Sequence, residues 1–136
     1  MIEWRDDLSV GIDTLDQDHQ EIIRLINAFI ESVETSLGVV TIHDRFRALQ
    51  KVVHRHFADE ETMMRQAEFE EFDAHKMQHD RLGEELDLLW DKMVLDPVFK
   101  ADDGMKEWLE SWLFRHVIRH DFEYRPAMWR LQSPGF

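Results

Sequence analysis

Four segments of the chain carry apolar residues at alternating spacings of three and four positions, and this periodicity constrains the fold more than any other feature. Such spacing places the apolar side chains on one face of an α-helix, whereas the two-residue alternation of a half-buried strand is absent. The segments run over about residues 15–37, 42–64, 72–95 and 102–124.

Turn-forming residues separate these segments, with Gly38 after the first and Asp96-Pro97 between the third and the fourth. Thr41 is the expected N-cap of the second helix, and Pro126 should end the fourth. Short connections favour antiparallel neighbours. We therefore expect an all-α, up-down-up-down antiparallel four-helix bundle with non-helical arms at residues 1–14 and 125–136.

Composition excludes several classes of partner and site. At 136 residues the chain has the length of one domain, so we expect a single domain over residues 1–136. The formal charge of −13 disfavours nucleic acid and anionic membranes as partners. The sequence contains no cysteine, so a metal would need nitrogen and oxygen ligands. The N-terminus has neither the basic start nor the apolar run of a signal peptide, and we expect a soluble cytoplasmic protein with no membrane partner.

Polar residues interrupt all four apolar stripes. Five histidines and one glutamate lie on the stripes, with an aspartate near the end of the last: His19, His56, Glu60, His75, His79, His116 and Asp121. A single buried histidine is usually a core residue hydrogen-bonded to a neighbour, and an isolated pair four positions apart is a weak metal signal. Seven such groups buried together without compensation would be costly, whereas a shared metal centre satisfies them all. His43 and His54 lie off the stripes, and we expect both to be solvated.

The number of donors indicates the kind of centre. Seven donors exceed the four of a zinc site, so either some of them do not touch the metal or two metals are present. Two carboxylates could bridge two cations and offset their charge. Five imidazoles suit iron better than magnesium, calcium or manganese, which prefer oxygen-rich surroundings. We therefore expect a di-iron site.

The motifs themselves resemble those of the hemerythrins, in particular the single-domain bacterial ones, over nearly the whole chain. The matching elements are Trp4 and "VGID" in the N-terminal arm, "LDQDH", "HFADEE", "HKMQH" and "HVIRHDFEY", in that order. The resemblance implies that His75, His79 and His116 hold one iron and that His19 and His56 hold the other. Glu60, Asp121 and a bridging oxo or hydroxo group would join the two irons.

The same resemblance assigns roles around the irons. Phe57, Trp112, Val117 and Ile118 would line a small oxygen pocket, and Tyr124 matches a tyrosine common in the family. Two residues depart from the common pattern: Asp18 stands where glutamine is frequent before the first histidine, and Val117 stands where isoleucine is commoner. Asp16 could orient His19 by accepting from its second ring nitrogen.

Helical spacing and resemblance disagree on the last ligand. At about 100° per residue, His120 lies about 40° from His116 and Asp121 about 140° away, so periodicity alone nominates His120. The need for a second bridging carboxylate favours Asp121. We therefore expect a local π-type distortion between His116 and Asp121.

The family's activity gives the expected function. The resemblance implies reversible dioxygen binding for storage, delivery or scavenging by a protein that is not an enzyme. The pocket residues are aromatic or aliphatic and cannot act as general acids or bases. A ferroxidase is disfavoured because the chain has no Glu-x-x-His motif. An enzyme that reduces peroxide or nitric oxide at the same centre is the alternative, as is an oxygen or redox sensor with an oxygen-using or signalling partner protein.

Overall fold

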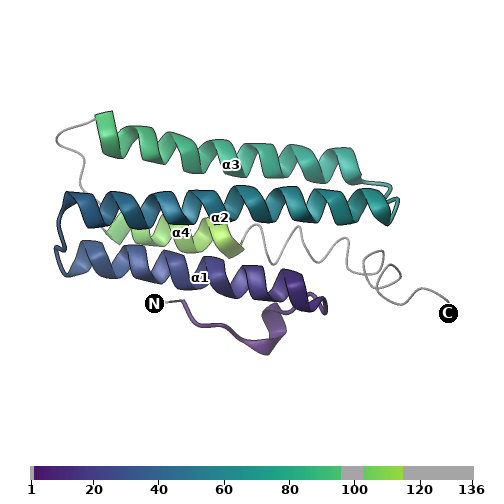
Figure 1. Cartoon of the computed structure of the whole chain (residues 1–136), viewed down its shortest axis with the longest axis horizontal. Coiled ribbons are helices and arrows are strands. Elements are labelled where there is room, and N and C mark those ends of the chain that lie inside the picture. The colour runs from purple at the N-terminus through teal and green to yellow at the C-terminus, as the bar shows by residue number, and fades with distance from the viewer. Residues whose placement is uncertain (1, 96–102, 115–136) are drawn as a thin grey trace.

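The computed structural model describes residues 2–95 and 103–114 of the chain, and within them it contains helices joined by short turns. In chain order these are the 3-10 helix η1 (Asp6–Leu8) and the α-helices α1 (Asp13–Glu34), α2 (Val39–Gln66), α3 (Phe72–Leu95) and α4 (Asp103–Phe114). The long helices α1, α2 and α3 run antiparallel to their neighbours along the chain, and α4 lies behind α1 and α2 in Figure 1. The expected all-α four-helix bundle is confirmed.

The start of α2 differs from the sequence prediction. The helix begins at Val39 and its N-cap is Gly38, whose φ of 96° glycine adopts more readily than other residues. The expectation that Thr41 caps the helix is therefore wrong. Val39 and Val40 are exposed, and the buried stripe of α2 begins only at Phe46. An apolar pattern reports the buried face and could not detect this solvated first turn.

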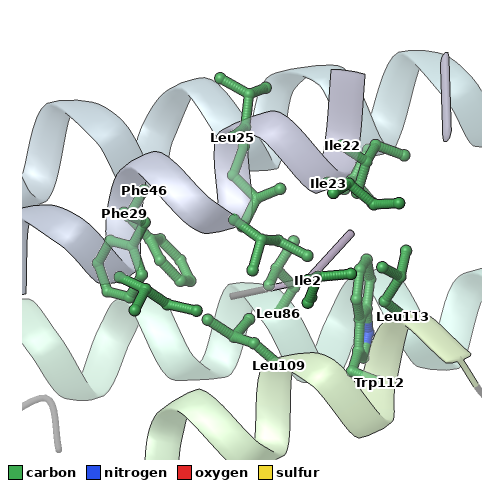
Figure 2. Close-up of a cluster of buried hydrophobic side chains, with 14 of the residues drawn as sticks. Ile2, Ile22, Ile23, Leu25, Phe29, Phe46, Leu86, Leu109, Trp112 and Leu113 are labelled. Atoms are coloured by element: carbon green, nitrogen blue, oxygen red, sulfur yellow. The ribbon is translucent and has the colours of Figure 1, made fainter. Parts of the chain in front are cut away.

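One large apolar cluster fills the bundle between all four α-helices. Figure 2 shows Leu109, Trp112 and Leu113 of α4 facing side chains of the other helices. The indole nitrogen of Trp112 donates a hydrogen bond to the carbonyl oxygen of Leu82 in α3, at 3.1 Å. This bond fixes α4 against α3 within the core.

The N-terminal arm is tied to α1. The backbone N–H of Ile2 donates to Asn27 Oδ1 at 3.0 Å, and Asn27 Nδ2 donates back to the Ile2 carbonyl at 2.7 Å. Further along, Val10 and Ile12 are fully buried in a second, smaller apolar cluster with Leu15 and Met64. The arm therefore covers the end of the bundle where α1 begins and α2 ends.

The helices of residues 2–95 and 103–114 do not have the character of membrane spans. None of them is long and apolar enough to cross a membrane.

Candidate metal centre

A layer of polar side chains separates the two apolar clusters. In each of the three long helices, buried donors lie between residues of the smaller apolar cluster and residues of the larger one. In α1, for example, His19 lies between Leu15 of the smaller cluster and Ile22 of the larger. Five donors are buried in this layer, all exposing 3% or less of their surface: His19, His56, Glu60, His75 and His79. The apolar stripes therefore enclose the predicted ligands on both sides along the bundle axis.

The donors approach one another closely around Glu60. The Nε2 atoms of His19 and His56 lie 2.9 Å apart, and His56 Nε2 lies 2.6 Å from Glu60 Oε1. His79 Nε2 lies 3.6 Å from the same carboxylate oxygen. The side chains come from three different helices, so the packing of α1, α2 and α3 creates this cluster.

Among the described residues, two groups of three in this layer bring their ligand atoms close enough together to hold a metal ion. One consists of His19, His56 and Glu60, the other of Glu60, His75 and His79, and in each the ligand atoms lie within 4.8 Å of one another. Imidazole nitrogens and a carboxylate oxygen are suitable ligands for iron, and for other transition metals. The two groups share Glu60, which places a two-oxygen ligand between two neighbouring sites. The donor set therefore fits a dinuclear cation centre.

Comparison with known proteins gives the family. A family model described as the hemerythrin HHE cation binding domain matches residues 10–128. The chain belongs to the hemerythrin family. It is thus a hemerythrin-type cation-binding domain, in agreement with the sequence prediction.

Several hemerythrins are similar to the chain over most of its length. A bacteriohemerythrin of Stenotrophomonas maltophilia is 28% identical over 91% of this chain and 79% of its own length. A bacteriohemerythrin of Clostridium acetobutylicum is 24% identical over 91% and 98%, and a myohemerythrin of Theromyzon tessulatum is 28% identical over 90% of each chain. A crystal structure of wild-type hemerythrin superimposes with a TM-score of 0.86 at 24% identity, covering 94% of this chain and 98% of that one, which supports the fold.

Two carboxylates to which the sequence assigned no role contact candidate histidine ligands at the ring nitrogen Nδ1. Asp18 Oδ2 lies 3.1 Å from His56 Nδ1, and Glu61 Oε2 lies 3.2 Å from His79 Nδ1. Each carboxylate directly adjoins a ligand in the sequence, as Asp18 does His19 and Glu61 does Glu60. This adjacency was the only available signal, because the contact itself depends on how neighbouring helices are rotated.

The surroundings of these carboxylates shift their pKa values in opposite directions. The hydrogen bond from His56 holds the pKa of the Asp18 carboxyl below its usual value, although partial burial opposes the shift. Burial raises the pKa of the Glu61 carboxyl, against the attraction of Lys76. Asp18 is therefore the more strongly anionic of the two.

Asp16 makes different contacts from the one predicted. Its Oδ1 accepts from the Val10 backbone N–H at 2.8 Å, and its Oδ2 accepts from the Ser9 hydroxyl at 2.5 Å. Asp16 thus ties the N-terminal arm to α1. Its proposed contact with His19 stays a prediction.

Two of the residues predicted to line an oxygen pocket, Phe57 and Trp112, are among the described residues. The ring of Phe57 stacks on His79, with centroids 4.2 Å apart and planes 8° from parallel. Trp112 is buried, with its N–H directed to the Leu82 carbonyl. The remaining predicted site residues lie outside the described residues: His116, Val117, Ile118, Asp121 and Tyr124, as do His120 and Pro126.

The two histidines expected to be solvated differ from each other. His54 is exposed and its Nε2 lies 3.0 Å from Asp87 Oδ1, as expected for a surface residue. His43 is half-buried, with its ring edge-on to Trp90 at a centroid distance of 5.2 Å, so the expectation is wrong there. The helical count placed His43 off the stripe but could not show that the large Trp90 ring reaches it from α3.

Proposed function

We propose that this hemerythrin domain binds dioxygen reversibly at a non-haem di-iron centre. The observation that carries the proposal is the pair of buried donor groups that share Glu60. His19 and His56 would hold one iron, and His75 and His79 the other. His116 would complete the second set, and Asp121 with an oxo or hydroxo group would bridge the irons beside Glu60. When bound, the two ferrous ions supply the electrons with which dioxygen is held and which are recovered when it leaves.

The surrounding residues favour a binding site rather than a site of turnover. Phe57 offers only a hydrocarbon face, and the single N–H of Trp112 is directed to a backbone carbonyl. General acid or base catalysis needs a titratable group within reach of the bound molecule, and neither side chain provides one. Both belong to the large apolar cluster that lies on one side of the donor layer. These features support an oxygen carrier that is not an enzyme.

Storage, delivery and local scavenging of oxygen all agree with such a site, and we place the protein in the cytoplasm as a soluble domain. A chain with a formal charge of −13 should not bind nucleic acid or an anionic membrane surface. A sensor role would require a separate partner protein that uses oxygen or signals.

The visible spectrum tests the proposal. Iron-loaded protein reduced under anaerobic conditions should gain a new absorption band in air and lose it again when oxygen is removed. Persistent turnover with excess reductant and peroxide or nitric oxide would instead favour the enzyme. A band that persists after oxygen is removed would indicate irreversible oxidation and would contradict reversible binding.

A further inference from the structure

Two of the proposed histidine ligands each contact a carboxylate on a neighbouring helix through Nδ1, the ring nitrogen that does not face Glu60. Asp18 of α1 contacts Nδ1 of His56 on α2 at 3.1 Å, and Glu61 of α2 contacts Nδ1 of His79 on α3 at 3.2 Å. Both contacts therefore cross a helix interface. One of the two rings belongs to each group of three that shares Glu60.

The chemistry of the contact determines which ring nitrogen can bind a metal. An ionised carboxylate can only accept a hydrogen bond, so the ring Nδ1 must carry the proton and donate it. The lone pair of a neutral ring then lies on Nε2, and this is the atom that faces Glu60 in both His56 and His79. The carboxylate contact therefore fixes both the tautomer and the direction of the ring.

Both carboxylates are enclosed and are themselves held by a surface cation. Asp18 and Glu61 expose 19% and 14% of their side chains. Arg55 lies 3.5 Å from Asp18, and Lys76 lies 3.6 Å from Glu61. The pair formed by His54 and Asp87 also joins α2 and α3, through Nε2 of the ring at 3.0 Å, but both of its side chains are 49% exposed and it lies outside the donor groups. It offers a matched control.

We propose that Asp18 and Glu61 are positioning residues of the metal centre, each orienting one ligand histidine of one half of the site. The inference rests on the proposed dinuclear centre. It assigns Asp18 to the half that contains His19 and His56, and Glu61 to the half that contains His75 and His79. Loss of either carboxylate should therefore affect one metal ion more than the other.

Metal binding by the full chain tests this assignment. Zinc and cobalt(II) would be titrated into metal-free wild type, Asp18→Asn, Glu61→Gln and Asp87→Asn against a competing chelator. Each of the first two variants should bind one ion about 10- to 100-fold more weakly, as is typical when such a partner is removed. The other ion should change much less, and Asp87→Asn should match wild type. The amides are close in shape to the carboxylates, and the circular dichroism of the metal-free variants checks their helical content.

Nuclear magnetic resonance of the zinc-loaded protein measures the ring N–H signals of individual histidines, and a general loss of stability would not shift one of these signals selectively. In Asp18→Asn the ring N–H signal of His56 should shift while that of His79 stays, and Glu61→Gln should do the reverse. Wild-type binding of two ions with unchanged affinities in both variants would overturn the positioning role alone. Equal weakening of both ions in each variant, with both ring signals shifted, would also overturn it. Uptake of fewer than two ions by wild type would instead overturn the proposed function.

Discussion

Glu60 should be the described ligand whose loss weakens metal binding most, because both donor groups contain it. At a free metal concentration 1,000-fold above its dissociation constant, one bound ion stabilises the fold by about 4.1 kcal/mol. With an unfolding entropy of about 2.1 cal/mol/K per residue, this raises the melting temperature of a 136-residue domain by roughly 14 °C. If Glu60→Gln weakens each ion about 100-fold, the gain per ion falls to about 1.4 kcal/mol, or roughly 5 °C.

Thermal unfolding followed by circular dichroism measures this difference. Wild type and Glu60→Gln would be melted under anaerobic conditions with ferrous iron and with a chelator. Glu84→Gln is the control, because Glu84 is an exposed glutamate of α3. A metal-dependent rise in melting temperature that is the same in Glu60→Gln and in wild type would refute the shared-ligand argument.

Three further tests address separate parts of the chain. Trp112→Phe removes the hydrogen bond to the Leu82 carbonyl and should cost about 0.5–1.5 kcal/mol in urea unfolding, whereas an unchanged midpoint would speak against that hydrogen bond. Gly83→Ala places a Cβ 3.1 Å from His54 Cε1, and this close contact should offset part of the helix-propensity gain of up to about 1 kcal/mol. The stability gained from Gly83→Ala should therefore be larger in a His54→Ala background. Equal gains in both backgrounds would show that the Cβ and the His54 ring do not touch. By metal analysis, Asp121→Ala should abolish paired iron binding and His120→Ala should retain it. The reverse result would show that His120, which regular helical spacing nominates, is the ligand.

The sequence predicted the helices better than their boundaries. The 3/4 spacing located all four helices, because burial of one face repeats along each of them. It failed at the first turn of α2, which is solvated. It also failed at the end of that helix, where the 3/4 rhythm through His56 and Glu60 predicts that Met63 is buried, whereas Met64 is buried and Met63 only half-buried. A strict 3/4 rhythm drifts relative to a helix of 3.6 residues per turn, so the predicted face is displaced after several turns.

The five described candidate ligands were predicted to be buried, because an inward-pointing side chain shares the stripe with the core. The residues that orient them were not. Asp18 and Glu61 lie beside the stripe, and their contacts depend on distances between helices that no spacing along one helix contains. The sequence named Asp16 for this role; in the structure Asp16 holds the N-terminal arm, and its contact with His19 stays a prediction.

The stoichiometry of oxygen binding tests the central claim most directly. Protein loaded with ferrous iron and cleared of excess metal would be titrated with oxygenated buffer, and the gas released on deoxygenation would be measured with an electrode. A dinuclear carrier predicts one dioxygen bound for every two irons and the same amount recovered. One dioxygen per iron, or uptake without recovery, would contradict reversible binding at a shared di-iron centre.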